Sequence, residues 1–258
     1  MTGFESLPHG VMLWIVLAML LAGVIQGTLG FGFPIIATPL VAMVVDMHTA
    51  VITVLLPTLA SVLVTLVTSG PPWRVLQRFW MMPIYAFLGA LAGTGLFIAA
   101  PHGPYLMLLG LVIIAYLNLD RVARGEWPLV RKYERAFGLL AGGAAGFFEG
   151  TANVAAPPLI IYYLALGLSP AALVQALQIC FAVGKITQFS VLTIYGGVSA
   201  SQWFATLPLI LVAIAAGFGG AHLRKRIHAD TFRIWVKRAL LLIAFALLVQ
   251  YAFQAIQF

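Results

Sequence analysis

The stretch GFFEGTANVAAPP, residues 146–158, interrupts a long apolar run and decides how the chain can fold. It contains the carboxylate of Glu149, two glycines, Asn153 and a Pro-Pro pair. In hydrocarbon every backbone N–H and C=O group must be bonded internally, so non-helical backbone survives only inside protein or beside a water-filled cavity. If the chain lies in a membrane, this stretch therefore predicts a broken helix that faces protein or a cavity.

The composition places the chain in a membrane. Its 258 residues are 62% hydrophobic and only 8% charged, whereas soluble domains carry about 25% charged residues. Apolar runs at 11–25, 80–99 and 240–253 approach the roughly 20 residues that cross a hydrocarbon core. The alternating ten-residue pattern of a transmembrane barrel is missing from the sequence. We therefore predict an all-α, polytopic helical membrane protein.

Charge and motifs exclude several functions. The net charge of +7 comes from basic residues in short loops, which is typical of cytoplasmic loops and not of nucleic-acid binding. Cys180 is the single cysteine, so we expect neither an intramolecular disulfide nor a cysteine metal site. The sequence has no P-loop, dinucleotide fingerprint or nucleophile elbow, and no metal-binding cluster. We expect no cofactor and no metal, and residues 11–27 are expected to be a permanent membrane segment, since no basic region precedes them.

The opening stretch has a partner earlier in the chain. GVIQGTLGFGFP, residues 23–34, aligns with GFFEGTANVAAP, residues 146–157. The offset is constant, because 150 − 27 and 157 − 34 are both 123. Gln26 then falls on Glu149, its near-isostere. The shared residues indicate an internal duplication.

Each half is expected to contain a helix, a break, a short helix and three full helices. In the first half these lie near 11–27, 27–33, 34–45, 49–69, 80–99 and 104–118. In the second half they lie near 136–149, 150–156, 157–167, 170–194, 202–221 and 234–256.

Basic residues predict the orientation of the two halves. They form three groups: Arg74 and Arg78; Arg121, Arg124, Arg131, Lys132 and Arg135; and Arg224, Lys225, Arg226, Arg233, Lys237 and Arg238. All three can be cytoplasmic if 136–168 crosses an even number of times, as a hairpin does. The first repeat (1–120) then starts outside, a basic cytoplasmic linker follows (121–135), and the second repeat (136–258) starts inside and ends outside. Inverted repeats with re-entrant or broken helices are typical of secondary transporters.

The breaks predict an anion site. Pro34 and Pro157 fit the first helical position, so each begins a short helix whose free N–H groups attract anions. Two such N-termini facing each other near mid-membrane would bind an anion without a metal. The alternative is that the glycines serve only close helix packing.

Two ionisable residues lie at membrane depth, Glu149 and Lys185. Helical spacing places Lys185 on one face with Gln178 and Gln188, so the lysine could neutralise an anion while the amides donate hydrogen bonds. The alternative is a buried ion pair between Glu149 and Lys185 that fixes the fold. The two interpretations can coexist, because a pair that opens is a switch.

With these residues the chain resembles the sulfite exporter TauE/SafE family. The resemblance is carried by AGVIQGTLGFGFPIIATPLVAMVVDMHTAV near the start and AGFFEGTANVAAPPLIIYYLALGLSPAALVQA in the second half. It implies transport of a small sulfur anion, such as sulfite, sulfoacetate or another organosulfonate, across a bacterial inner membrane. It also implies that the breaks line the cavity, at Gly27, Gly30, Gly32, Pro34, Gly150 and Pro157. Asn153 replaces an expected glycine and becomes a candidate donor.

Our leading hypothesis is a secondary-active carrier that works by alternating access. The family resemblance favours export, and import stays open because no residue pattern separates the two directions. The anion would lie near Thr28, Thr151, Asn153 and Lys185, and Glu149 would couple transport to protons, whereas its counterpart Gln26 cannot titrate. Expected partners are the small anionic substrate and the lipid bilayer, with no nucleic acid, and a homo-oligomer stays open. Two alternatives are an intramembrane enzyme acting on a lipid phosphate and a passive anion channel. No second catalytic group accompanies Glu149, so we expect no enzyme.

Overall fold

The computed structural model describes residues 8–101, 103–118, 127–223 and 229–256, and these are helical with short connections and no strand. In the first half the helices are α1 (His9–Leu29), α2 (Phe33–Ala42), α3 (Met47–Thr68), α4 (Trp73–Arg78), α5 (Met81–Ala99) and α6 (Tyr105–Leu117). In the second half they are α8 (Pro128–Lys132), α9 (Glu134–Ala152), α10 (Ala156–Ala165), α11 (Pro170–Ile194), α12 (Ala200–Ala205), α13 (Leu207–Leu223) and α14 (Ala229–Ile256).

Five of these segments are long and apolar enough to cross a membrane: His9–Leu29, Met47–Thr68, Met81–Ala99, Pro170–Ile194 and Ala200–Leu223. The helices α2, α6 and α10 are apolar but shorter. The chain is therefore a multi-pass helical membrane protein, as its composition predicts. The basic residues at 121, 124 and 224–226, on which the predicted orientation partly depends, lie outside the described residues.

Helix bounds recur along the chain with the offset found in the sequence. The short helices α2 and α10 begin at 33 and 156 and end at 42 and 165, which are 123 residues apart at both ends. The long helices α3 and α11 begin at 47 and 170, again 123 apart. The opposite orientation of the two halves stays a prediction.

The structure differs from the predicted helices at three places. Two short helices that were not predicted, α4 and α8, precede α5 and α9, and the helix predicted at 202–221 is divided into α12 and α13 around Thr206. A capping box between Ser199 and Gln202 begins α12, and Pro208 lies in the first turn of α13. Proline fits the first turn because no intrahelical partner is needed there, so a new helix starts at this point.

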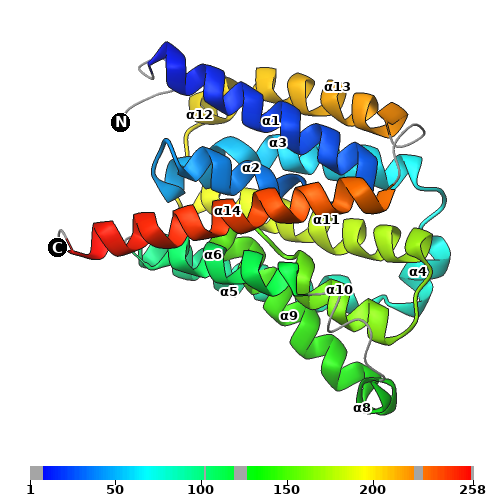
Figure 1. Cartoon of the computed structure of the whole chain (residues 1–258). Coiled ribbons are helices and arrows are strands. Elements are labelled where there is room, and N and C mark those ends of the chain that lie inside the picture. Colours follow the sequence, from blue (N-terminus) through cyan, green and yellow to red (C-terminus); the bar gives the residue numbers. More distant parts are fainter. Residues whose placement is uncertain (1–7, 102, 119–126, 224–228, 257–258) are drawn as a thin grey trace.

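Each broken helix packs against a full helix of the other half. Helix α1 lies along α13, and α9 lies along α5, while α3 and α11 cross between these pairs (Figure 1). Glycines allow the close approach: a Cβ on Gly27 would come within 1.9 Å of the Gly217 carbonyl oxygen, and one on Gly146 within 2.0 Å of the Ala86 oxygen. The two halves are therefore interleaved, and both breaks lie inside the bundle.

The two breaks use the same backbone device. Helix α1 ends at Gly30 with φ 81°, and α9 ends at Asn153 with φ 63°, both in the left-handed region. Glycine adopts this region freely, and asparagine is one of the few other residues that tolerate it. Asn153 is the one non-glycine residue with positive φ in the described chain. Because Asn153 lies 123 residues after Gly30, the second break keeps the turn and gains a side chain.

Candidate functional site

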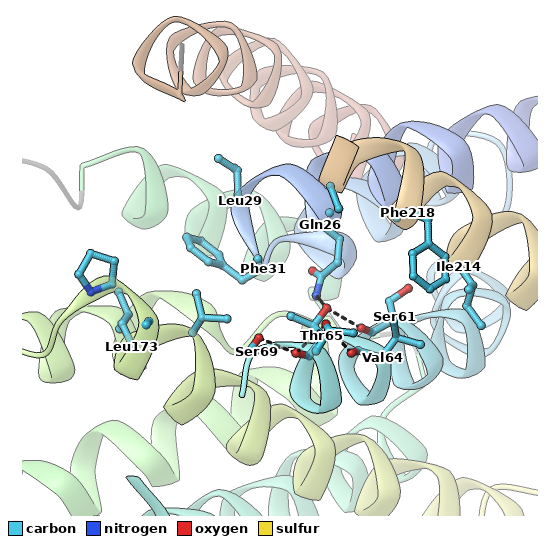
Figure 2. A pocket seen from close by; sticks show the side chains of 18 of the residues that line it. Gln26, Leu29, Phe31, Ser61, Val64, Thr65, Ser69, Leu173, Ile214 and Phe218 are labelled. Atoms are coloured by element: carbon cyan, nitrogen blue, oxygen red, sulfur yellow. Dashed lines mark hydrogen bonds between the residues drawn. The ribbon is translucent and has the colours of Figure 1, made fainter. Parts of the chain in front are cut away.

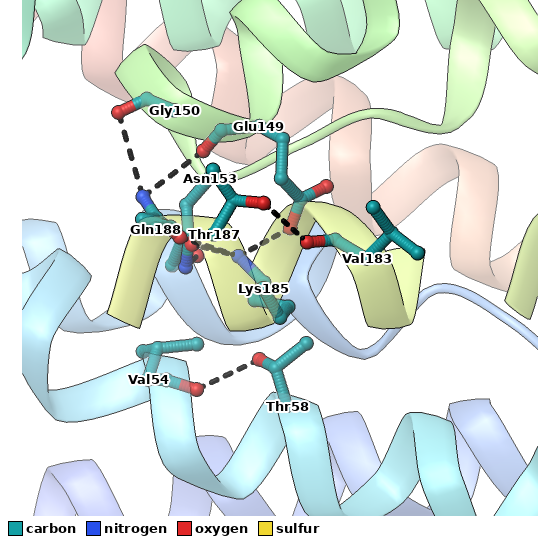
Figure 3. Close-up of polar contacts among 10 residues, drawn as sticks. Val54, Thr58, Glu149, Gly150, Asn153, Val183, Lys185, Thr187 and Gln188 are labelled. Carbon is teal, nitrogen blue, oxygen red and sulfur yellow. Dashed lines mark hydrogen bonds and ion pairs between the residues drawn. The ribbon is translucent and has the colours of Figure 1, made fainter. Parts of the chain in front are cut away.

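The second break carries a buried cluster of charged and polar side chains around Lys185 (Figure 3). Lys185 is 0% exposed and Glu149 is 1% exposed. The lysine ammonium forms an ion pair with Glu149 Oε1, donates to Asn153 Oδ1, and donates to Gln188 Oε1 at 3.0 Å. An ammonium has three N–H donors, so all three find an oxygen. We refer to Glu149, Asn153, Lys185 and Gln188 as the Lys185 cluster.

The Lys185 cluster joins three helices. The left-handed turn at Asn153 places its side chain between α2 and α11, where its Nδ2 donates to Thr38 Oγ1 at 2.8 Å. Gln188 Nε2 on α11 donates to the Glu149 carbonyl at 3.0 Å. The Glu149 carbonyl also accepts from the Asn153 N–H at 3.1 Å, and Gln188 Nε2 lies 3.4 Å from the Gly150 carbonyl. Gln188 therefore adds a donor at the end of α9, where the last carbonyls of a helix lack intrahelical partners. The cluster therefore holds the break of α9 against both α11 and the first half.

The ion pair anticipated as one alternative is present, and it leaves acceptor capacity unused. Within the described residues, Glu149 Oε2 is buried without a hydrogen-bond partner. Buried polar atoms are nearly always bonded, and exceptions call for an explanation such as a role in catalysis or an unseen ligand. Glu149 therefore combines a structural contact with a second carboxylate oxygen that has no hydrogen-bond partner among the described residues.

The first break has an uncharged counterpart of this cluster. Gln26, equivalent to Glu149, accepts a hydrogen bond from the Phe33 N–H at 3.1 Å and donates to Thr65 Oγ1 at 3.0 Å. Val62, which precedes Lys185 by the same 123 residues, is buried and apolar. The Phe33 N–H at the start of α2, which we expected to be free for an anion, is thus bonded within the protein.

A cavity of about 740 Å³ lies beside the first break, between α1, α3, α13 and the start of α11 (Figure 2). Its polar lining comes from Gln26, Ser61, Thr65, Thr68, Ser69 and Ser169. Its apolar lining includes Phe31, Leu173, Val174, Ile214 and Phe218. This volume falls within the range of small-molecule sites, about 300–1,000 Å³.

The predicted site residues divide between these two places. Gln26, Gly27 and Gly30 line the cavity, whereas Glu149, Asn153, Lys185 and Gln188 form the buried cluster. Gln178 links the halves by donating to the Gly30 carbonyl at 2.7 Å. The structure therefore does not bring Lys185 and the glycines of the first break into one pocket.

The remaining predicted residues serve packing in this structure. Thr28 donates to the Val24 and Gly220 carbonyls at 2.7 and 3.1 Å, and Thr151 donates to the Phe147 carbonyl at 2.8 Å. A Cβ on Gly150 would come within 2.4 Å of the Thr94 nitrogen on α5. Three others are not among the cavity-lining residues: Gly32, Pro34 and Pro157.

Sequence reasoning missed one wall of the cavity. Ile214 and Phe218 lie on α13, and Leu173 lies on α11. The apolar sequence around them does not differ from that of a lipid-facing helix. Ser61 and Thr65 could be noticed as hydroxyls within an apolar helix, but the sequence does not show which helices face them.

Comparison with known proteins gives one match. The model of the family described as "Sulfite exporter TauE/SafE" matches residues 15–247, which is nearly the whole chain. Neither the curated proteins nor the solved structures contain a match to the chain.

Proposed function

This chain belongs to the sulfite exporter TauE/SafE family of membrane transporters, and from that premise we propose that it is a secondary-active carrier, and not an enzyme, for a small sulfur anion. The substrate class is sulfite, sulfoacetate or another organosulfonate, moved by alternating access in the direction of export. The observation that carries this proposal is the cavity of about 740 Å³ beside a broken helix inside a membrane bundle.

Unequal cavities in the two halves support alternating access. A smaller cavity of about 240 Å³ is lined by Leu91, Thr187 and Val191, among others. With the offset of 123, these three residues correspond to Ile214, Val64 and Thr68 of the large cavity. Equivalent positions thus line a larger cavity in one half and a smaller cavity in the other, an asymmetry that a carrier in one of its two states would have.

The cavity lies where α3 and α13 end, just before Arg74 and Arg224 in the sequence. Basic loops favour the cytoplasmic side, so this state is inward-facing. In the other state we expect the positions around Leu91 and Thr187 to separate and the walls of the large cavity to close. The proposed location is a bacterial inner membrane, and the proposed partners are the anionic substrate and the lipid bilayer.

Glu149 is the proposed coupling residue. Its carboxylate holds Lys185 in a cluster that joins α9, α11 and α2. Protonation would remove one charge of the ion pair and weaken the contact between α9 and α11. Since α11 lines the smaller cavity, a proton at Glu149 would favour opening there.

The test is uptake into proteoliposomes with a panel of sulfite, sulfate, sulfoacetate and carboxylate analogues. We expect saturable flux of sulfite or an organosulfonate that responds to an imposed pH gradient. Flux of carboxylates but not of sulfonates would reject the substrate class, and flux that ignores the pH gradient would reject the role of Glu149. Absence of any anion flux from folded protein would reject the carrier itself.

A further inference from the structure

The large cavity has a polar strip between apolar sides. Gln26 from α1 and Ser61 and Thr65 from α3 form the strip (Figure 2). Phe31 and Leu173 lie on one side of it, and Ile214 and Phe218 lie on the other. A ligand that fills this space would place a polar group on α3 and an apolar group against the aromatic rings.

Ser61 distinguishes this strip from ordinary polar residues of a membrane helix. Thr58 and Thr65, its neighbours on α3, each donate to the carbonyl four residues earlier, at 2.7 Å. Such back-bonding is the usual way that hydroxyls are satisfied in helices. Ser61 is 5% exposed, and its Oγ has no hydrogen-bond partner among the described residues. A buried hydroxyl left unbonded is costly, which points to a ligand that completes it.

Two further donors face the same space. Gln26 Nε2 uses one of its two N–H groups on Thr65, so the second is free to donate. Helix α11, 25 residues long, begins at the cavity with Ser169 as its cap and Pro170 and Ala171 in the lining. The first N–H groups of a helix have no intrahelical partner and favour anions. Pro170 has no N–H and the Ala172 N–H donates to Ser169 Oγ, so the Ala171 N–H is the donor that this terminus offers to the cavity.

None of the described residues that line the cavity carries a formal charge. Lys185 is fully buried in its own cluster with all three donors used. Among the described residues, an anion in this cavity would therefore be held by neutral hydrogen-bond donors and by the N-terminus of α11.

We propose that the Gln26–Ser61–Thr65 strip is the binding site for the oxyanion group of the substrate, and that Phe218 and its neighbours bind an organic tail. The preferred substrate is then an organosulfonate with a short carbon chain, and inorganic sulfite binds more weakly. This inference rests on the proposed function, because it names the residues and the substrate class of the same transport pathway. It assigns the charged Lys185 cluster to the coupling step and not to substrate binding.

The experiment measures the Kd of propanesulfonate, sulfoacetate and sulfite by calorimetry, with purified full-length protein in detergent. In Ser61→Ala we expect the Kd of all three anions to rise about tenfold or more, as for loss of one hydrogen bond to a charged group. In Phe218→Ala we expect weaker binding of propanesulfonate, whose carbon chain is apolar, and little change for sulfite. Thr53→Val is the matched control, because Thr53 lies buried on α3 with its hydroxyl bonded to the Thr49 carbonyl and does not line the cavity.

A second measurement uses Ser61→Cys and a water-soluble thiol reagent. The native Cys180 is buried and is not among the cavity-lining residues, whereas Ser61 is. Labelling therefore reports the introduced thiol, and sulfoacetate should slow it. Wild-type protein that binds sulfoacetate, together with an unchanged Kd in Ser61→Ala or labelling that sulfoacetate does not slow, overturns this inference and leaves the carrier proposal standing. Folded wild-type protein that binds no sulfur anion overturns both.

Discussion

Removing one charge of the buried Glu149–Lys185 ion pair should destabilise the protein, whereas removing both charges should restore most of its stability. In Glu149→Gln the Lys185 ammonium keeps Asn153 and Gln188 as acceptors but loses its countercharge while remaining 0% exposed. Removing one partner of a buried pair costs about 3–5 kcal/mol. At about 2–4 °C per kcal/mol for a chain of this size, the melting temperature should fall by roughly 6–20 °C.

The double variant Glu149→Gln/Lys185→Met should recover most of that loss. Replacing a whole buried ion pair by neutral groups of similar volume is often without cost. The first half supplies a precedent, since Gln26 and Val62 occupy the equivalent positions and are buried without charge.

The assay is thermal unfolding of the detergent-purified protein, followed by tryptophan fluorescence, for the wild type, both single variants and the double variant. Single variants that melt at the wild-type temperature would refute the view that the pair is buried and paired. A double variant as unstable as the worse single variant would show that other contacts of these side chains matter more than the charges. In proteoliposomes the double variant should still move substrate but no longer respond to a pH gradient.

The remaining predictions concern packing, capping and the second break. Gly146→Ala should destabilise the protein by about 1–3 kcal/mol, because its Cβ would meet the Ala86 oxygen at 2.0 Å. Gly143→Ala on the same helix is the control, since its Cβ would meet nothing within 4 Å. Thermal unfolding measures both variants, and equal effects would contradict the packing. Asp46→Ala should cost about 1 kcal/mol, since its carboxylate caps α3 by accepting from the Thr49 N–H and hydroxyl at 3.0 and 2.6 Å. Partial burial alone would raise the pKa of Asp46, but the Thr49 hydrogen bonds and the nearby His48 leave it below its ordinary value of 3.8. A depressed pKa means that the cap stabilises fully above that ordinary value and is lost as the pH falls through the folded-state pKa, so a wild-type advantage over Asp46→Ala that persists at lower pH would contradict the capping. At Asn153 we expect glycine to be tolerated better than alanine by roughly 1–2 kcal/mol, because only glycine keeps the left-handed turn without strain; equal stabilities in urea would contradict it.

Much of the helical architecture could be predicted from the sequence. Gly30, Gly32 and Asn153 indicated the breaks, since such residues are uncommon in a lipid-facing helix. The prolines indicated where the short helices begin. The predicted range 170–194 coincides with α11. The constant offset of 123 aligned the helices of the two halves because close backbone contacts require glycines at fixed positions, such as Gly27 and Gly150.

The site was harder to predict because it depends on which helix faces which. Gln26 and Glu149 are equivalent in sequence, but one faces the cavity beside Ser61 and the other meets Lys185. The difference comes from partners on other helices, including Thr65 for the glutamine. In an apolar chain, hydropathy does not distinguish a helix face toward lipid from a face toward a cavity, so Phe218 gave no signal.

The most direct test of the central claim is a counterflow experiment. Proteoliposomes are loaded with unlabelled sulfoacetate, diluted, and given labelled sulfoacetate outside, with Ser61→Ala and Thr53→Val run beside the wild type. A carrier with a binding site that alternates between the two sides predicts a transient accumulation of label above equilibrium in the wild type and in Thr53→Val, and a much smaller one in Ser61→Ala at the same concentration. Label that only equilibrates, with no overshoot and no dependence on internal substrate, would contradict the account and indicate a passive pore.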